Sequence, residues 1–383
     1  MAYAIVNGSI YTETGMIPEG YIIVENETIK DVQPGAYTGE LETINADGYH
    51  ILPGFIDIHI HGGYGEDAMD ASYTGLQHLA HQLLSEGTTS FLATTMTQSN
   101  KAIERALNNI VKVQNDQNGT EAADIVGIHL EGPFISENKI GAQNPKFIQR
   151  PTASQLQHLQ NVAKGQIKIV TIAPEVEGAE ETMKTLKNDV IFSMGHSEVT
   201  FDQANHAAKI GVQHVTHLYN AGTPFGHRAP GMFGAAWLNP NLKCEIIVDG
   251  VHSHPAAVQI AYKQKGADHL YLITDAMRAK GMPDGCYDLG GQDVIVKDNE
   301  AHLKTGSLAG SILKMNDGLR NLMDFTGGSL DILWRCTSFN QAKALGIDDK
   351  KGSVKVGKLA DLVILDQQMH VRQTIKSGRI HQF

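Results

Sequence analysis

The sequence predicts an α/β protein built as a closed (β/α)8 barrel, with a small β-sandwich domain formed by both chain ends. Between about residues 54 and 351, short apolar runs alternate with helical stretches, as in parallel sheets whose strands are buried on both faces. Eight such runs are present, the number that a closed barrel needs. Residues 1–53 and 352–383 instead carry short strands separated by turns.

The two chain ends are expected to pair as one domain of residues 1–53 plus 352–383. Their strands are predicted at Ala4–Val6, Tyr21–Glu25, Thr28–Val32, Asp361–Leu365 and His370–Ile375. Turn residues separate the first three strands, at Asn7-Gly8, Pro18-Glu19-Gly20 and Asn26.

The barrel domain is expected over residues 54–351. Its strands are predicted at Gly54–His61, Thr88–Ala93, Ile125–Leu130, Ile167–Ile172, Val190–Ser193, Val212–Thr216, Lys243–Val248 and Leu270–Ile273. Helices are predicted between most of them, at Tyr73–Ser85, Ala102–Val113, Ser154–Ala163, Phe201–Lys209 and Pro255–Lys265. A hairpin-like insert over Tyr287–Leu303 and a helical region over Ser311–Leu345 are expected to follow the eighth strand.

The composition limits the kinds of partner that the chain is expected to bind. Lysine and arginine number 31 against 42 acidic residues, a formal charge of −11, which opposes general attraction to nucleic acid or anionic membranes. No apolar run approaches the length of a membrane span, and the amino end lacks a signal-peptide pattern. The three cysteines form no C-x-x-C pair. We therefore expect a cytoplasmic protein with neither nucleic-acid nor membrane partners.

Histidines and acids gather at the predicted strand ends. His59 and His61 lie two apart on an extended strand, so both side chains point to the same side, into the barrel. Glu131 ends a buried strand, where a carboxylate is costly unless it is paired or liganded. His196 and His217 end two neighbouring strands, and Asp275 ends the eighth. These six residues converge on the face where barrel enzymes carry their chemistry.

This set favours a metal site. Nitrogen and carboxylate ligands without cysteine suit zinc or iron, between which the sequence does not choose. A divalent ion lowers the pKa of bound water and polarises a carbonyl, as amide hydrolysis requires. Asp275 would then shuttle the proton from water to the leaving nitrogen. Two nearby residues keep open interpretations: His129 packs in its strand or shares the face of Glu131, and Asp57 orients a histidine or caps a turn.

Seven segments carry a resemblance to known proteins. They are Pro53-Gly54-Phe55-Ile56-Asp57, His129-Leu130-Glu131-Gly132-Pro133-Phe134, Gly195-His196-Ser197, Thr216-His217-Leu218-Tyr219-Asn220-Ala221, Asp249-Gly250-Val251-His252, Thr274-Asp275-Ala276 and Leu308-Ala309-Gly310-Ser311. On these segments the chain resembles the amidohydrolase superfamily nearly end to end, most closely its sugar-phosphate deacetylases. The resemblance implies a metal-dependent amidohydrolase barrel that converts N-acetylglucosamine 6-phosphate to glucosamine 6-phosphate and acetate.

The resemblance also implies roles for single residues. Glu131, His196 and His217 would hold the main metal, and Asp275 would be the acid and base. The sugar phosphate would contact Ala142, Gln143, Asn220, Ala221, Arg228, His252, Leu308, Ala309 and Gly310. The arginine of relatives can serve the neighbouring subunit's site, which implies a homodimer. Arg228 also lies in a glycine-rich loop after a ligand-bearing strand, and a guanidinium forks well onto phosphate.

Two departures from some relatives bear on the chemistry. Gln143 stands where others carry a histidine thought to polarise the substrate carbonyl, and its amide can donate a hydrogen bond but no charge. His59 and His61 are both present, whereas some single-metal members have lost this pair. We therefore expect one or two divalent ions per chain, the second sharing Glu131 as a bridge.

Three alternatives remain at this point. The chain could deacetylate the galactosamine epimer, because the contacts at one hydroxyl decide between the epimers. It could hydrolyse a cyclic amide, as a dihydroorotase does, although those enzymes usually carry a carboxylated lysine where this strand offers Glu131. It could also be a non-catalytic binding protein on the same fold, although such relatives typically lose ligands.

Overall fold

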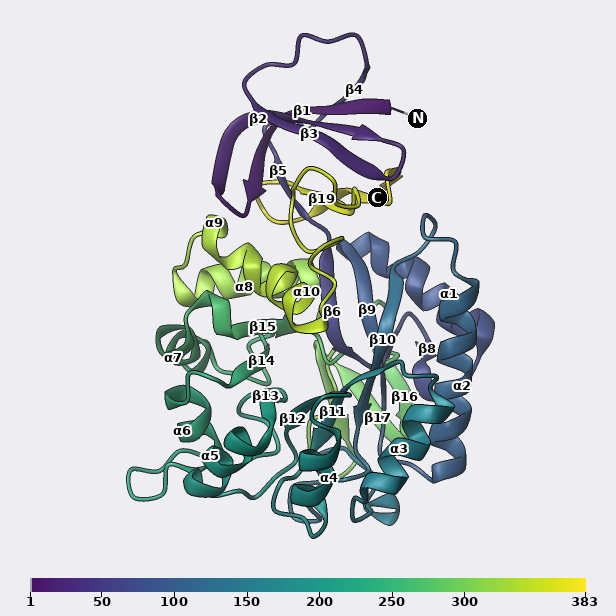
Figure 1. The fold of residues 1–383 in the computed structure, drawn as a ribbon, viewed down its shortest axis with the longest axis vertical. Helices are drawn as coiled ribbons and strands as arrows, with labels where there is room; N and C mark the ends of the chain where they lie inside the picture. The colour runs from purple at the N-terminus through teal and green to yellow at the C-terminus, as the bar shows by residue number, and fades with distance from the viewer. Residues whose placement is uncertain (1) are drawn as a thin grey trace.

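A computed structural model describes residues 2–383. Figure 1 shows a barrel surrounded by helices, with a separate sheet at one end that holds both chain termini. The barrel sheet has the order β15-β14-β13-β12-β11-β10-β9-β6, and every neighbouring pair is parallel. A bridge between Ile60 and Ala276 joins its two edges. The predicted fold class is therefore confirmed.

The eight predicted barrel strands are present, with ends within two residues of those expected. Their bounds are β6 Phe55–Ile60, β9 Thr88–Thr95, β10 Asp124–Glu131, β11 Ile167–Ile172, β12 Ile191–Met194, β13 Val212–Val215, β14 Lys243–Ile247 and β15 Leu270–Ile273. Nearly every residue of these strands is buried, because side chains fill the barrel on one face and helices cover the other.

Helices alternate with the barrel strands along the chain. Their bounds are α1 Tyr73–Gln82, α2 Asn100–Asp116, α3 Ala153–Val162, α4 Ala179–Leu186, α5 Phe201–Ile210, α6 Gly231–Leu238, α7 Pro255–Lys265, α8 Met315–Thr326, α9 Leu330–Leu333 and α10 Phe339–Leu345. Short 3-10 helices lie at Ala68–Asp70, Leu83–Glu86, Pro145–Phe147, Ala267–His269 and Trp334–Thr337.

Side-chain caps explain where several helices begin. Ser99 accepts a hydrogen bond from the backbone of Ala102, so α2 begins at Asn100, two residues before the expected start. Thr200 and Gln203 form a reciprocal capping box at the start of α5. The sequence did not predict α4 or α6. The α6 segment is apolar on all sides and contains two glycines, so it shows no amphipathic period.

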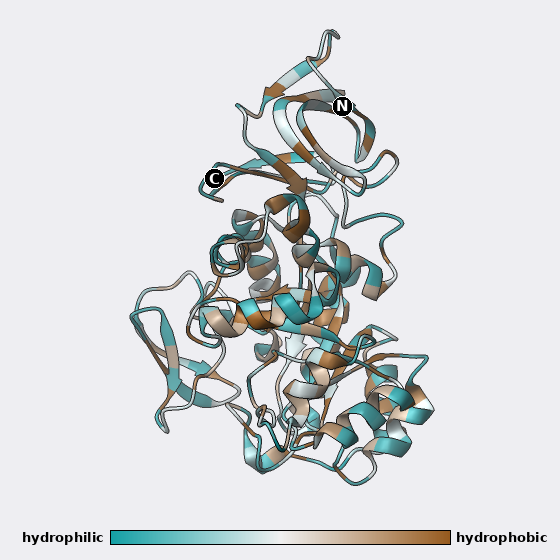
Figure 2. Ribbon diagram, turned by 90° about the vertical axis from the view of Figure 1, so that its left-hand side faces the viewer, coloured by the Kyte–Doolittle hydropathy of each residue, from teal (hydrophilic) through white to brown (hydrophobic). Residues whose placement is uncertain are grey.

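One sheet combines strands from both chain ends. Its order is β21-β20-β19-β5-β1-β2-β3, and β4 pairs with β1. The bounds are β1 Ala2–Thr12, β2 Gly15–Glu25, β3 Thr28–Pro34, β4 Glu42–Asn45, β5 His50–Pro53, β19 Leu362–Leu365, β20 Val371–Lys376 and β21 Arg379–Gln382. A separate apolar core lies within it, and Figure 2 shows hydrophobic and hydrophilic residues intermixed along these strands near both termini.

Two expected turns in this sheet are wrong. Asn7-Gly8 lies inside β1, where the pairing register with β2 shifts on either side of Gly8. Asn7 there has a φ of 59°, so a bulge takes up the turn-prone residues without ending the strand. Pro18-Glu19-Gly20 lies within β2, opposite that bulge. The turn at Asn26 is present between β2 and β3.

The insert after the eighth barrel strand is a three-stranded antiparallel meander. Its strands are β16 Gly285–Leu289, β17 Gln292–Lys297 and β18 Glu300–Leu303. The connections are the expected turns at Gly290-Gly291 and Asp298-Asn299. A small hairpin, β7 Gly62–Gly63 and β8 Glu66–Asp67, follows β6. Leu289 of the meander and Leu308 beyond it reach the cavity described below.

Four charged residues, three of them buried and Asp124 half-buried, form a group where the barrel meets the terminal sheet, which we call the junction cluster: Asp124, Lys351, Asp361 and Lys376. The Lys351 Nζ lies 2.6 Å from a carboxylate oxygen of Asp124 and 2.5 Å from one of Asp361. The Lys376 Nζ lies 3.1 Å and 3.3 Å from the same two groups. Each ammonium thus contacts both carboxylates, and the cluster connects β10 with β20.

Candidate metal centre and active site

A cavity of about 260 Å³ opens at the carboxyl ends of the barrel strands. It is lined by His61, Met96, Glu131, Gly141, Ala142, Gln143, His196, His217, Asn220, Ala221, His252, Asp275, Leu289, Ser307, Leu308 and Gly310. Most of the site residues expected from the sequence are therefore found together at one cavity.

The first ligand group consists of Glu131, His196 and His217. Glu131 is the last residue of β10, and each histidine lies two residues beyond the end of its strand. The Glu131 Oε1 lies 3.1 Å from the Nε2 of both histidines, and these two nitrogens are also 3.1 Å apart. Two ligand atoms bound to one zinc ion at its usual bond lengths stand roughly 3 to 3.5 Å apart. The three atoms therefore have the spacing of ligands around one ion.

The second group consists of His59, His61 and Asp275. The Asp275 Oδ1 lies 3.1 Å from the Nε2 of His61 and 3.4 Å from that of His59. Glu131 faces this group too, with its Oε1 3.5 Å from His59 and its Oε2 3.3 Å from His61. One carboxylate thus stands between two sets of possible ligands.

Hydrogen bonds on the far side of three rings fix which nitrogen faces the centre. The Nδ1 of His196 lies 2.8 Å from the Lys139 carbonyl, and that of His61 lies 3.3 Å from the Thr94 carbonyl. The Nδ1 of His59 lies 2.9 Å from Glu245. A nitrogen facing such an acceptor carries the proton, so the Nε2 lone pair is free to bind a metal. The His59 Nε2 is buried without a hydrogen-bond partner, which fits a nitrogen that a cation would ligate.

The charges in the centre depend strongly on one another. Burial raises the pKa of Glu131, but the neighbouring histidines outweigh it and hold that pKa well below the ordinary value. Burial raises the pKa of Asp275 as well, and His59 and His61 lower it to about 2. Burial lowers the pKa of His61, and the carboxyls of Asp275 and Glu131 raise it to about 9. Positive charge is therefore strongly favoured here, and a divalent cation supplies it without protons on the rings.

The backbone bends sharply at three of these residues. His196, His217 and Asp275 have φ angles of 49°, 28° and 49°. Residues other than glycine in this left-handed region cost on the order of 1 to 3 kcal/mol each, and they cluster at functional sites. The bends turn side chains at the strand ends toward the barrel axis.

Gln143 holds Glu131. Its Nε2 donates to the Glu131 Oε2 at 2.6 Å, and its Oε1 accepts from the Thr97 backbone at 2.7 Å. Because the Thr97 N–H fixes the orientation of the amide, its NH₂ group faces the carboxylate. Gln143 thus lies at the cavity and contacts the residue that the two ligand groups share.

The remaining expected contacts divide into three kinds. Ala142, Asn220, Ala221, His252, Leu308 and Gly310 line the cavity. Ala309 does not line it, because its side chain is fully buried and its backbone donates to Ala301 of β18. Arg228 does not line it either: it lies in the loop before α6 and is exposed.

The structure settles the two residues whose interpretation was open. Both ring nitrogens of His129 have partners, the Ile58 carbonyl at 2.9 Å and the Thr171 hydroxyl at 2.7 Å, so His129 packs inside the barrel. Asp57 accepts from the Thr274 hydroxyl at 2.5 Å and from the His59 backbone at 3.2 Å. It therefore connects β6 to the end of β15, where the barrel closes.

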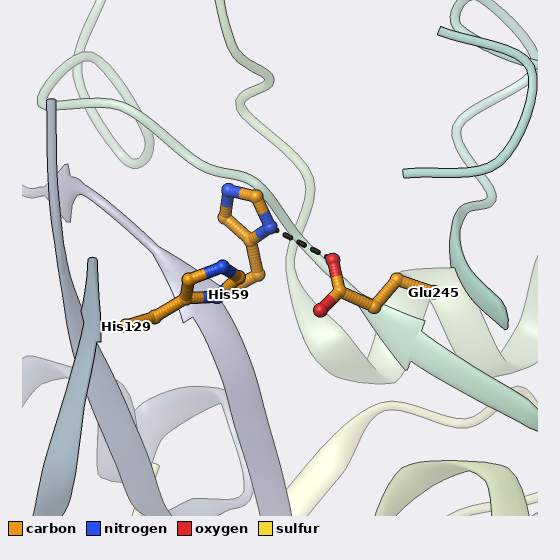
Figure 3. Close-up of side chains that lie close together, drawn as sticks. All are labelled: His59, His129 and Glu245. Atoms are coloured by element: carbon orange, nitrogen blue, oxygen red, sulfur yellow. Dashed lines mark hydrogen bonds and ion pairs between the residues drawn. The ribbon is translucent and has the colours of Figure 1, made fainter. Parts of the chain in front are cut away.

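Glu245 is a residue that sequence reasoning missed. It lies fully buried in β14 and contacts the ring of His59 (Figure 3). The available signal was a charged residue inside an apolar run, Cys244-Glu245-Ile246-Ile247-Val248. Met96, Leu289 and Ser307 also line the cavity without having been predicted, because they reach it from separate parts of the chain: the end of β9, the end of β16 and the loop after β18.

The fold and the site define a barrel hydrolase with metal-ligating residues at the carboxyl ends of its strands. The amidohydrolase family model matches residues 50–381, and the chain belongs to that family. It is 45% identical to N-acetylglucosamine-6-phosphate deacetylase of Bacillus subtilis, over 96% of this chain and 97% of that one. It is 41% identical to the Lysinibacillus sphaericus enzyme of the same name, over 99% and 98%. N-acetylgalactosamine-6-phosphate deacetylase of Escherichia coli O157:H7 is 34% identical over 98% of both chains.

Solved structures agree with these relatives. The N-acetylglucosamine-6-phosphate deacetylase from Pasteurella multocida superposes with a TM-score of 0.94 at 29% identity, covering 100% of both chains. A mutant of the Mycobacterium smegmatis enzyme in complex with N-acetyl-D-glucosamine-6-phosphate superposes with a TM-score of 0.93 at 30% identity, covering 99% of this chain and 98% of that one. Over residues 2–383, no helix has both the length and the apolar character needed to cross a membrane.

Proposed function

We propose that this chain hydrolyses the N-acetyl amide of N-acetyl-D-glucosamine 6-phosphate, giving glucosamine 6-phosphate and acetate. The observation that carries the proposal is the meeting of Glu131, His196 and His217 at mutual distances of 3.1 Å in a cavity also lined by most of the expected sugar contacts. The near end-to-end similarity to deacetylases of this name supports the choice of substrate. The reaction would serve amino-sugar breakdown in the cytoplasm.

The six ligand atoms suit one or two divalent ions, zinc or iron by donor type. Glu131, His196 and His217 would hold the main ion, and His59 and His61 would hold a second one that shares Glu131. A bound divalent ion lowers the pKa of water and polarises the amide carbonyl.

Asp275 is the proposed general base and acid. With a pKa lowered to about 2, its carboxylate is ionised at neutral pH and can accept the proton of the attacking water. The same carboxyl then passes that proton to the amide nitrogen as the carbon–nitrogen bond breaks. Its position at the cavity, in contact with His59 and His61, supports this role.

The sugar phosphate would lie against Ala142, Asn220, Ala221, His252 and the Leu308–Gly310 loop. The Nδ1 of His252 lies 2.6 Å from Asp249, which leaves its other nitrogen free for a ligand oxygen. Arg228 is exposed in the single chain, and we propose that it reaches the phosphate in the neighbouring subunit of a homodimer.

Acetate release tests the proposed reaction. Purified protein loaded with zinc or iron is mixed with N-acetylglucosamine 6-phosphate, with Asp275→Asn as control. Rapid acetate release by the wild type alone supports the proposal. Preference for the galactosamine epimer, or turnover of a cyclic amide with no acetate from the sugar phosphate, would replace it by that activity. No turnover of any of them would favour a binding protein.

Two further measurements test the finer points. Metal analysis after loading with excess zinc should give two equivalents for the wild type and one for His59→Ala, and one for both would exclude the second ion. Arg228→Ala should raise KM for the phosphorylated substrate without changing turnover of the unphosphorylated sugar. Sedimentation should show a dimer, and a monomer with full activity would contradict the assigned role of Arg228.

A further inference from the structure

Glu245 is an acidic side chain in a part of the barrel that holds almost no opposite charge. It sits in the middle of β14 with no exposed surface, between the apolar residues Cys244 and Ile246. Burying a carboxylate costs several kcal/mol unless charge or hydrogen bonds compensate it. Across the described part of the chain, its one ionisable partner is His59. The free-energy cost of burying this carboxylate indicates a role beyond packing.

A single oxygen of Glu245 contacts both ligand groups. Its Oε2 lies 2.9 Å from the Nδ1 of His59, and it accepts the backbone N–H of His217 at 3.3 Å. His59 belongs to the second ligand group, whereas His217 belongs to the first. Figure 3 shows the carboxylate directed at the near edge of the His59 ring.

The contact with His59 decides which nitrogen of that ring faces the centre. Because a carboxylate accepts only, the Nδ1 carries the proton and the Nε2 presents a lone pair. That Nε2 lies 3.4 Å from Asp275 and 3.5 Å from Glu131. In the other tautomer, an N–H group would occupy the position of a cation, and the second group would lose a ligand.

The contact with His217 acts on the backbone. The His217 Nδ1 is buried without a hydrogen-bond partner, unlike that of the other three rings. Its ring is therefore aimed by its backbone, which has the uncommon φ of 28°. A hydrogen bond from that N–H to Glu245 helps to hold this conformation.

A third group of possible ligands consists of His59, His129 and Glu245, whose ligand atoms lie within 4.8 Å of one another. The hydrogen bonds of these residues exclude a third metal site. Both nitrogens of His129 are taken by Ile58 and Thr171, and the His59 Nδ1 is already bonded to Glu245. The group is a hydrogen-bonded support beneath the metal centre.

We propose that Glu245 is a positioning residue for the metal centre: one carboxylate fixes the His59 tautomer for the second ion and the His217 backbone for the first. The proposal rests on the metal centre of the proposed function, and it assigns Glu245 no contact with substrate. Loss of Glu245 should weaken the second ion more than the first, because its bond to His59 is the shorter and acts on the ring itself.

Calorimetric titration of zinc into chelator-treated protein tests this. Glu245→Leu should lower the affinity for the second zinc ion by about 10- to 100-fold, the range found for outer partners of metal ligands, and that for the first ion by less. Glu245→Gln keeps an acceptor oxygen and should lose about tenfold in affinity for the second zinc ion, the lower end of that range. Ser193→Ala is the matched control: its buried hydroxyl, on β12 two strands away from β14, bonds Thr216, and zinc binding should not change.

A second measurement separates positioning from mere packing. Thermal unfolding of the zinc-free proteins measures the packing contribution: Glu245→Leu should be less stable than the wild type, because it leaves the buried N–H groups of His59 and His217 without an acceptor. Wild-type zinc affinities in Glu245→Leu, with reduced zinc-free stability, would overturn the proposal. If the leucine variant does not fold, the same comparison is made with Glu245→Gln, and unchanged zinc binding in it overturns the proposal.

Failure of the proposed function gives a different result. Wild-type protein that binds two zinc ions but releases no acetate would refute the substrate and leave the effect of Glu245 measurable. Wild-type protein that takes up one zinc ion only would overturn the role of Glu245, because His59 would then have no ion to hold.

Discussion

The metal centre and the junction cluster are both buried groups of charged side chains, but they are balanced differently. In the junction cluster, two lysines contact two aspartates, so the protein supplies both signs of charge itself. In the metal centre, two carboxylates face four imidazoles, which are neutral unless protonated. The first cluster is complete as folded, whereas the second is completed by a cation. Burial of charge by itself therefore does not separate a structural cluster from a functional one; the balance of charge does.

The backbone conformation also differs between the metal centre and the junction cluster. His196, His217 and Asp275 of the metal centre have positive φ angles, whereas none of the four junction residues does. Conformational strain is thus concentrated where ligands must be aimed. We expect substitutions in the metal centre to change activity more than stability, and those in the junction cluster to do the reverse.

The largest expected effect is on activity, from Asp275→Asn. The variant keeps the shape of the side chain but cannot accept a proton, so kcat for acetate release should fall by about 10²- to 10⁴-fold. The exposed control Asp268→Asn should retain full activity. A loss smaller than tenfold in Asp275→Asn would contradict the role of this carboxyl.

The junction cluster should show the opposite behaviour with Asp361→Ala. This variant leaves Lys351 and Lys376 with only the carboxylate of Asp124, and breaking a buried ion pair costs about 3 to 5 kcal/mol. Denaturant unfolding measures this loss of stability, while kcat per folded molecule should stay near the wild-type value. Lys297→Ala, at an exposed lysine, serves as the control and should change neither quantity. Equal loss of activity and stability would erase the distinction between the two clusters.

Zinc should stabilise the protein through the metal centre alone. Adding zinc to chelator-treated protein at 100 times its dissociation constant should raise the free energy of unfolding by about 2.7 kcal/mol per ion, since the folded state binds it. The same gain is expected in Asp361→Ala, because the junction cluster holds no ion. Thermal unfolding with and without zinc measures both, and a gain that disappears in the junction variant would show that the regions are not independent.

The smallest effect is on acid stability. Burial raises the pKa of Asp361, but Lys351 and Lys376 outweigh it and hold that pKa below its ordinary value of 3.8. A carboxyl whose pKa is lower when folded adds stability above its unfolded pKa and loses it as the pH falls through the folded value. The zinc-free wild type should therefore lose stability as the pH falls below about 4. The loss is about 1.4 kcal/mol for each pH unit by which the folded-state pKa of Asp361 lies below its unfolded-state pKa. Denaturant unfolding at several pH values should show a shallower loss in Asp361→Ala, and parallel curves would contradict the assignment.

The two regions also differ in how far the sequence revealed them. The ligands of the metal centre could be found because each lies at a strand end, and the carboxyl ends of parallel strands converge wherever the barrel closes. The junction cluster could not be found, because nothing local in the sequence pairs Asp124 with Lys351, Asp361 or Lys376. Glu245 falls between these cases, since its burial was suggested by its apolar neighbours while its partners lie on other strands.

Local patterns failed where tertiary packing overrode them. Asn7-Gly8 and Pro18-Glu19-Gly20 have the composition of turns, yet β1 and β2 absorb them in a bulge. The helix α6 lacks an amphipathic period, because barrel and neighbouring helices bury it on nearly all sides. Arg228 is exposed in the single chain, so its contact with the substrate phosphate stays a prediction.

The sequence by itself determined the barrel, its strands and the residue types at the strand ends, because continuous apolar runs and the alternation of strand and helix are local properties. The tertiary structure decided which atoms meet: that Glu131 faces both ligand groups, that Gln143 contacts Glu131, and that one oxygen of Glu245 reaches His59 and His217. Those contacts depend on the registers between strands far apart in the chain, and no local pattern encodes a register across a closed sheet.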